Sequence, residues 1–125
     1  MCSSDLLCYA RLLAQERRWD EARTVVERVL RDSDAAVVAE AAAMIAETYQ
    51  GQGEHLTAAE YYMTAAYVAP QTAAGRQALL GAGRAFTALK QVDAAEKVYR
   101  KLLAEGNVPA DLADAARRGL AELKR

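Results

Sequence analysis

The side chains that most often take part in catalysis are few in this sequence and are not grouped. His55 is the only histidine, and no Ser, Cys or Asp near it stands in the context of a nucleophile. A histidine that acts as a base also needs a further group to orient its ring. We therefore expect His55 to be a solvated turn residue.

Other patterns that sometimes indicate chemistry also have simpler interpretations. The two cysteines lie six residues apart, which is not the spacing of a metal or redox motif. Gly51-Gln52-Gly53 and Gly81-Ala82-Gly83 are not phosphate loops, because neither follows a strand of a βαβ unit. The carboxylates of Asp20 and Glu21 suit the first turn of a helix, where the helix dipole favours negative charge. The sequence thus predicts no enzyme activity, no metal site and no cofactor.

The composition describes a folded chain without a strong electrostatic field. Its 125 residues are enough for one domain, and 53% hydrophobic with 26% charged residues is typical of a globular protein. Sixteen basic and seventeen acidic side chains nearly cancel, so nothing draws in nucleic acid or an anionic membrane. The chain also has no apolar stretch long enough to cross a bilayer. We expect neither nucleic-acid binding nor direct membrane insertion.

Hydrophobic positions recur at helical spacing along nearly the whole chain. Asp34 is suited to cap the start of the third helix, and Thr57 with Glu60 has the spacing of a capping box at the start of the fourth. In that fourth helix, we expect Ala59, Met63, Ala66 and Tyr67 to form the inner stripe. The expected helices cover about 5–17, 20–30, 35–50, 57–69, 73–89, 93–103 and 110–124.

One short pattern occurs three times at nearly constant spacing. It reads Trp19-Asp20-Glu21-Ala22, then Leu56-Thr57-Ala58-Ala59, then Val92-Asp93-Ala94-Ala95. The closing alanines lie 37 and 36 residues apart. A period of this length indicates stacked helix–turn–helix units.

The residues inside each unit resemble those of the tetratricopeptide repeat. The third unit fits that pattern best, with Leu79, Ala82, Gly83 and Phe86 in its first helix and Ala95, Tyr99 and Leu102 in its second. The second unit has Ala42, Ile45, Ala46 and Tyr49, then Ala59, Met63, Ala66 and Pro70. The first has Leu6, Tyr9, Ala10 and Leu13, then Ala22, Val26 and Val29.

The resemblance implies an all-α fold, a tetratricopeptide-like α-solenoid of three antiparallel helix pairs plus one C-terminal helix. We expect a single array over 7–125, with repeats at about 5–34, 35–72 and 73–108 and a terminal helix at 110–125. This last helix is either a polar cap or the first half of a further repeat. The residues expected to pack the repeats together are Ala10, Ala22, Ala46, Ala59, Gly83, Phe86, Ala95 and Tyr99.

Two features of the sequence bear on where the protein comes from. The first six residues resemble the translation of a sequencing adapter, so we expect 1–6 to be an artefact or a disordered start of a longer, metagenomic protein fragment. The long spacing and the linker from Pro70 to Gly83 are similar to those of a bacterial subgroup. That subgroup includes periplasmic proteins that accompany the Tol–Pal system and outer-membrane-assembly lipoproteins. A periplasmic or cell-envelope location and a cytoplasmic one both remain possible.

The resemblance also implies a concave face lined by the first helix of each pair. One charged residue per repeat is expected there, and such a face suits an extended peptide. Each of these residues also has a simpler interpretation as a solvated helix charge. The family's clamp for chaperone tails requires Asn and Lys at these positions, so that activity is not expected. The candidate residues are Arg11, Glu47, Arg84 and Arg118, flanked by Leu7, Ala43, Gln50, Leu80 and Thr87.

Two aromatic features complete the list of candidates. Tyr61 and Tyr62 are candidate surface aromatics, although packing against a neighbouring helix explains them equally well. Trp19 is expected to close the first helix pair.

The function predicted from the sequence is a non-enzymatic scaffold that binds a protein or an extended peptide. The alternative is a structural or oligomerisation module whose open end stacks on missing repeats or on another copy.

Overall fold

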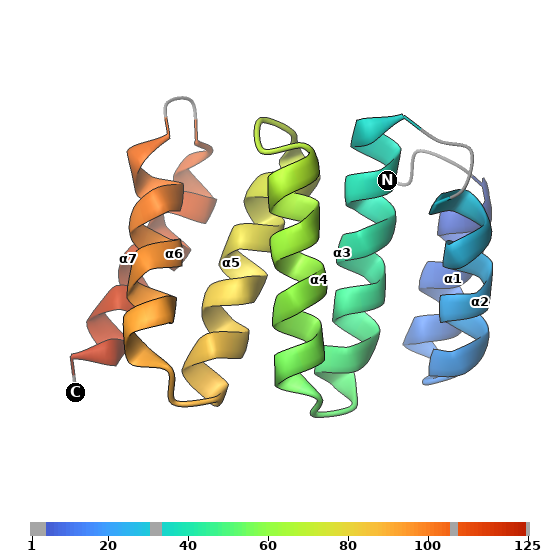
Figure 1. Cartoon of the computed structure of the whole chain (residues 1–125), viewed down its shortest axis with the longest axis horizontal. Coiled ribbons are helices and arrows are strands. Elements are labelled where there is room, and N and C mark those ends of the chain that lie inside the picture. Colours follow the sequence, from blue (N-terminus) through green and yellow to red (C-terminus); the bar gives the residue numbers. More distant parts are fainter. Residues whose placement is uncertain (1–4, 31–33, 106–107, 125) are drawn as a thin grey trace.

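The computed structural model describes residues 5–30, 34–105 and 108–124 and shows seven helices over them (Figure 1). The expected helices are all present, with ends that differ by up to a few residues. Residues 1–4 of the suspected adapter segment lie outside the described residues, whereas Asp5 and Leu6 belong to the first helix. The helices are α1 (Asp5–Gln15), α2 (Trp19–Leu30), α3 (Ala35–Gly51), α4 (His55–Val68), α5 (Ala73–Ala88), α6 (Val92–Ala104) and α7 (Ala110–Leu123).

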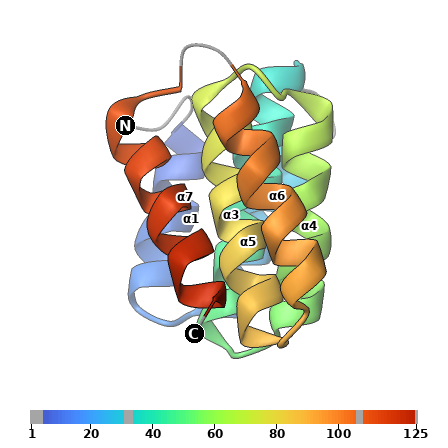
Figure 2. The same ribbon diagram turned by 90° about the vertical axis from the view of Figure 1, so that its left-hand side faces the viewer.

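The helices form two layers. Each helix contacts the next one along the chain, and α1, α3, α5 and α7 also contact one another in that order. Over the described residues, α2, α4 and α6 make no comparable contact with each other. Seen from the end, α1 and α7 stand out to one side of α3 and α5, so the layer of odd-numbered helices is concave (Figure 2). The predicted α-solenoid of three antiparallel pairs and a terminal helix is confirmed.

Small side chains lie where helices approach closely. Ala10, Ala46 and Gly83 are buried in the first helices of the pairs, and Ala22, Ala59 and Ala95 are buried in the second helices. Phe86 is half-buried against the same core. A methyl group or a hydrogen at these positions lets two helix backbones approach, so that the larger core side chains can interlock around them. The largest fully buried side chains include Leu7, Leu79 and Leu102.

The inner stripe of α4 differs from the predicted one at its aromatic position, whereas Ala59 and Ala66 are buried as expected. Tyr67 was expected to face inward, but its side chain is 88% exposed, whereas Tyr62 is only 7% exposed. Ala58 is also fully buried, four residues before Tyr62, just as Ala95 lies four residues before Tyr99. The reason is local: Gly81 of α5 has no side chain and leaves room for the Tyr62 ring. The sequence pattern placed the two alanines correctly but assigned the buried aromatic position to Tyr67 in place of Tyr62.

The start of α4 also differs from the prediction. This helix begins at His55, and Glu54 in the N-cap position makes no side-chain capping bond. Thr57 therefore lies inside the first turn, and the capping box of Thr57 and Glu60 is wrong. The cap of α3 is confirmed, because the Asp34 carboxylate accepts a hydrogen bond from the Val37 backbone N–H at 3.1 Å.

In α1, the packed stripe consists of Leu7, Ala10 and Leu13. Leu6 and Tyr9, expected on the inner stripe, are 44% and 49% exposed. Among the described residues, α1 has helical neighbours only in α2 and α3, and no other described helix covers its remaining side. Leu7, expected beside the concave face, is instead fully buried.

Trp19 packs between the first and the second repeat, whereas the sequence predicted that it would close the first helix pair. A side chain at Gly51 of α3 would place its Cβ 2.8 Å from the Trp19 ring, so the indole of α2 lies directly on this glycine. Next to it, the guanidinium of Arg23 lies 4.2 Å from the centre of the Tyr49 ring and donates a hydrogen bond to Gln52 at 2.7 Å. These contacts hold the first helix pair to the second through a cation–π interaction and close aromatic packing.

Candidate functional site

The four charged residues expected on the concave face come from the four helices that form it. Arg11 lies on α1, Glu47 on α3, Arg84 on α5 and Arg118 on α7, and all four are exposed. Their order along the face is therefore one basic, one acidic and two basic residues. Thr87, one turn after Arg84, is half-buried and donates a hydrogen bond to the Gly83 carbonyl at 2.8 Å.

Two tyrosines of the other layer reach between these helices. Tyr62 of α4 extends to Gly81 of α5, where an added Cβ would lie 2.6 Å from the ring. Tyr99 of α6 lies between Gly83 of α5 and Gly119 of α7, where an added Cβ would lie 2.5 Å from the ring in each case. Since a Cβ cannot approach a ring this closely, the three glycines are what admit the tyrosines. The hydroxyl ends of the rings thereby come close to the charged residues of the concave face.

Burial and the charges of the concave face both act on the pKa values of the two tyrosines. The pKa of Tyr62 is raised to about 12, mainly by burial and in smaller part by the charge of Glu47, while the charge of Arg84 opposes the rise. Burial likewise raises the pKa of Tyr99, with Thr87 and Arg84 opposing the rise. Both phenols therefore stay protonated at neutral pH and remain able to donate a hydrogen bond.

Glu47 is an acidic group in a poorly hydrated position. Although its side chain reaches solvent, loss of hydration raises the pKa of Glu47, and the positive charge of Arg11 on α1 opposes that rise. A carboxylate that is short of water gains from a cationic ligand more than a fully hydrated one does. Glu47 is thus the acidic member of the row formed by Arg11, Glu47, Arg84 and Arg118.

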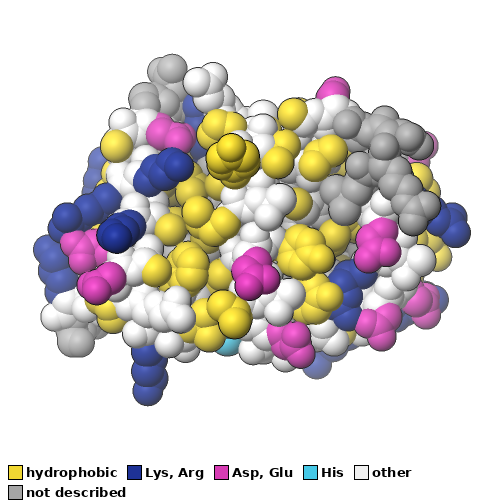
Figure 3. Space-filling model, in the orientation of Figure 1, with side chains coloured by type: hydrophobic (Ala, Val, Ile, Leu, Met, Phe, Trp, Pro, Cys, Tyr) yellow, Lys and Arg dark blue, Asp and Glu magenta, His cyan; other side chains and the backbone are white. Residues whose placement is uncertain are grey.

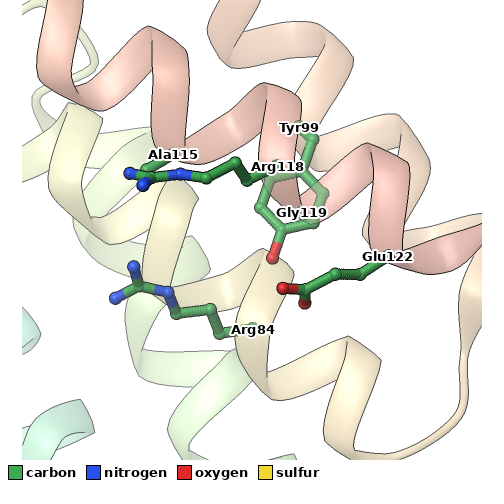
Figure 4. A pocket seen from close by; sticks show the side chains of 6 residues that line it. All are labelled: Arg84, Tyr99, Ala115, Arg118, Gly119 and Glu122. Carbon is green, nitrogen blue, oxygen red and sulfur yellow. The ribbon is translucent and has the colours of Figure 1, made fainter.

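A cavity opens at the C-terminal end of the concave face (Figure 4). Its volume is about 370 Å³, and α5, α6 and α7 line it. Figure 4 shows the guanidinium groups of Arg84 and Arg118 on one side and the Glu122 carboxylate with the Tyr99 hydroxyl on the other. Over the described residues, neither guanidinium forms a hydrogen bond or an ion pair. The remaining lining residues are Ala115 and Gly119.

Several expected site residues do not contribute to this surface. Leu80 is buried in α5, and Tyr62 is part of the core, so it is not a surface aromatic. Gln50 is held at the turn, where its Oε1 lies 2.8 Å from Nδ1 of His55. His55 is accordingly a half-buried first residue of α4 with a hydrogen-bond partner, and not a solvated turn residue. Tyr61 is half-buried and stacks on Tyr49, with ring centres 5.8 Å apart.

Sequence reasoning missed two features of the surface. Glu122 lies one turn after Arg118 on α7, and this spacing of four residues was the signal that could have placed it at the cavity. Among the described residues, Tyr67 is the most exposed large hydrophobic side chain. It was missed as a surface aromatic because the sequence pattern predicted it on the inner stripe of α4. Figure 3 shows the face of α2, α4 and α6, where hydrophobic side chains gather over the middle and most Lys and Arg lie toward the ends.

The described part of the chain holds neither a metal-type cluster of side chains nor a helix that could cross a membrane. Residues 5–30, 34–105 and 108–124 contain no group of three or more His, Cys, Asp or Glu side chains placed to hold a metal ion. No helix among these residues combines the length and the apolar character that spanning a membrane requires.

Comparison with known proteins agrees with this architecture. Residues 39–72 match the model of the tetratricopeptide repeat family, inside the predicted second repeat. The structure is similar to the crystal structure of the Sgt2 tetratricopeptide-repeat domain from Aspergillus fumigatus. That similarity has a TM-score of 0.77 and 26% sequence identity, and it covers 96% of this chain and 75% of the other. Curated protein sequences gave no match.

Residues 39–72 are therefore similar to a tetratricopeptide repeat, and the chain has the fold of a tetratricopeptide-repeat domain. Such domains are in general non-catalytic modules that bind proteins or peptides.

Proposed function

We propose that this chain is a non-enzymatic scaffold that binds an extended protein segment along its concave face. The observation that supports the proposal is the arrangement of Arg11, Glu47, Arg84 and Arg118 on four successive helices of one hollow layer. Extended segments carry unpaired backbone groups and alternating side chains, which such a row of charges, with the Tyr99 hydroxyl at the cavity, can bind. Because the helices are already in place, the protein loses little conformational entropy on binding.

A charge reversal on the concave face tests this proposal. Random 12-residue peptides displayed on phage are selected on the immobilised full chain, and the enriched peptides are synthesised for fluorescence anisotropy. Arg84→Glu is expected to weaken their binding at least about tenfold, since a cationic contact becomes repulsive or is lost. Lys97→Glu, the same charge change at an exposed position on α6, is the control and should leave the affinity within about twofold.

Either of two results would contradict the scaffold. One is that no peptide is enriched, and the other is that Arg84→Glu and Lys97→Glu change binding to the same small extent. Circular dichroism of both variants checks that the helices are intact. Neither nucleic acid nor membrane is part of the proposal, because basic and acidic side chains nearly cancel.

The repeat spacing supports a finer assignment within the family. The 36–37-residue period and the linker from Pro70 to Gly83 fit the long-repeat bacterial type, similar to Tol–Pal-associated and outer-membrane-assembly proteins. On this proposal, the sequence is a fragment of a longer repeat protein of the cell envelope. The complete gene, read from its source, would show the upstream and downstream codons. A gene without further repeats and without an export signal would contradict the assignment.

A second function has one observation in its favour. Leu6, Tyr9 and Leu12 are exposed hydrophobic side chains on the uncovered side of α1, as expected of an end that stacks on a further repeat or on another copy. In this alternative, the chain is a structural or oligomerisation module. Light scattering of the purified chain tests self-association, and a monomer at all concentrations, unchanged by Leu12→Glu, would exclude stacking on another copy.

A further inference from the structure

The buried hydrophobic side chains of the described residues form two separate clusters that meet at α3. The larger cluster extends from α3 through α4, α5 and α6 to α7. The smaller cluster joins α1 and α2 to a different face of α3. Among the described residues, no buried side chain belongs to both. The smaller cluster consists of Leu7, Ala10, Val26, Ala41, Met44 and Ile45.

The two ends of the row of helices are therefore attached in different ways. At the C-terminal end, Ala116 of α7 belongs to the larger cluster, and the Tyr99 ring lies against Gly119 of the same helix. Helix α7 can move away only if the larger cluster loses one of its members. The first helix pair, in contrast, can leave α3 at the expense of the smaller cluster alone, so the larger cluster stays intact.

Two half-buried tyrosines lie between the clusters. Among the described residues, Tyr49 and Tyr61 are the only hydrophobic side chains that pack against both clusters. Their rings stack with centres 5.8 Å apart. The Arg23 guanidinium of α2 lies 4.2 Å from the centre of the Tyr49 ring. Helix α2 thus reaches the junction of the two clusters through a cation and not through a buried apolar side chain.

Arg23 fastens the first helix pair to α3 mainly through polar contacts. Its side chain is only 14% exposed, and its charge is paired with Asp20 of its own helix. It donates hydrogen bonds to Gln52 at 2.7 Å and to Thr48 at 3.3 Å, both at the end of α3. Water can replace such hydrogen bonds when the helices separate. Beside Arg23, Trp19 rests on Gly51, and we call Trp19 and Arg23 the clasp.

We propose that the first helix pair, α1 and α2, is an arm that opens and closes against α3 while the larger cluster stays folded, and that the clasp holds it closed. Of the four charged residues of the concave face, Arg11 alone lies on the arm. Opening therefore removes one end of the charged row and leaves the other three positions in place. It also uncovers the face of α3 that carries Met44 and Ile45. The concave face thus exists in a long and a short form, and their populations depend on the clasp.

The clasp contains its own probe, because Trp19 is the only tryptophan of the chain. The full chain is titrated with urea, and the fluorescence emission of Trp19 is followed. At the same urea concentrations, pulsed hydrogen exchange follows α4, which lies inside the larger cluster. The Trp19 emission should shift to the red at a midpoint about 1 M urea or more below the midpoint for exposure of α4. Exchange in α1 and α2 should follow the Trp19 transition.

Arg23→Ala tests the polar part of the clasp. It should lower the midpoint of the Trp19 transition by about a further 0.5 M urea or more and leave the α4 midpoint unchanged. A red-shifted emission before urea is added, with α4 still protected, is the extreme form of the same result. The matched control is Arg100→Ala on α6, where Arg100 also pairs with an acidic residue of its own helix but is 67% exposed. This variant should move neither midpoint.

A pair of glycine variants tests the aromatic part of the clasp. A Cβ at Gly51 would lie 2.8 Å from the Trp19 ring, and a Cβ at Gly81 would lie 2.6 Å from the Tyr62 ring of the larger cluster. Gly51→Ala should therefore displace the indole and lower the Trp19 midpoint alone. Gly81→Ala should lower the α4 midpoint, because it overpacks the larger cluster.

Two results would overturn the arm. One is that Trp19 and α4 have the same midpoint in the unmodified chain, since the two clusters would then unfold together. The other is that Arg23→Ala lowers both midpoints equally, since Arg23 would then support the whole molecule and not the arm. The measurements use no ligand, so their outcome is independent of the binding function proposed above.

Discussion

At the scale of single residues, the close approach of Tyr99 to two glycines controls the spacing of three helices. The ring is wedged between Gly83 of α5 and Gly119 of α7, so it cannot move away from one without meeting the other. The Tyr99 ring thereby couples the position of α5 to that of α7. Gly81 and Tyr62 form the equivalent contact one repeat earlier.

We expect Gly83→Ala to destabilise the protein even though alanine favours helix. Alanine would add up to about 1 kcal/mol of helix propensity, but its Cβ would lie 2.5 Å from the Tyr99 ring. Overpacking of this kind costs about 1–3 kcal/mol, so a net loss in the free energy of unfolding should appear in urea titrations. In a Tyr99→Leu background the same substitution should cost less, because the ring is absent. An equal cost in both backgrounds would show that the ring is not the obstacle.

The raised pKa of Tyr62 predicts a loss of stability in alkali. Burial holds its folded-state pKa at about 12, above the unfolded value of about 10. The unfolded chain therefore releases this proton first, and the free energy of unfolding falls as the pH rises from about 10 toward 12. The loss from this one group should reach about 1–3 kcal/mol. Tyr62→Phe should remove that part of the pH dependence, and a variant with an unchanged slope between pH 10 and 12 would contradict the assignment.

At the scale of helices, the capping residues show how much of the local structure the sequence predicts. Asp34 was predicted correctly as an N-cap because it is a short acidic side chain directly before an apolar helical run, and such side chains accept hydrogen bonds from the backbone N–H groups of the first turn. The capping box at Thr57 was wrong because the loop after Gly51 is shorter than the glycines suggest. Gly53, with φ of 81°, turns the chain at once, and α4 begins at His55, two residues before Thr57.

The cap of α5 gives a test with a matched control. The Thr72 hydroxyl accepts a hydrogen bond from the Gly75 backbone N–H at 3.0 Å and donates one to the Ala69 carbonyl at 2.7 Å. Thr72→Ala should lower the free energy of unfolding by about 1–2 kcal/mol. Glu54→Ala changes the same position of α4, where the side chain makes no capping bond, and should cost less than about 0.5 kcal/mol. Thermal melts of the two variants compare them, and a reversed order would contradict the capping geometry.

At the scale of the whole molecule, the repeat pattern predicted the architecture and the small residues at the helix contacts, but not which of the large side chains are buried. Periodic small residues such as Ala22 and Ala95 fix the number and order of the helices, since each pair must repeat the same close contact. The concave charges were also placed on the correct helices. The sequence could not show that Tyr62 is buried and Tyr67 exposed, because each of these tyrosines fits a helical stripe. Only Gly81, which lies on another helix, decides between them.

The two-layer arrangement also predicts how stability is distributed along the chain. In a solenoid, each helix is held mainly by its nearest neighbours. The central helices α3, α4 and α5 have neighbours on both sides, whereas α1 and α7 end the row. Backbone amides of α4 should therefore exchange with deuterium only at the rate of global unfolding, and those of α1 and α7 should exchange through smaller openings.

Hydrogen exchange measured by mass spectrometry across a series of urea concentrations separates these cases. Exchange that depends strongly on urea marks global unfolding, and weak dependence marks local opening. As an internal control, Gly83→Ala should raise exchange in α5, α6 and α7, which meet at the Tyr99 ring, before it affects α1 and α2. Equal protection of all seven helices, with equal dependence on urea, would mean that the repeats unfold as one unit and that neighbour-by-neighbour stacking does not describe this protein.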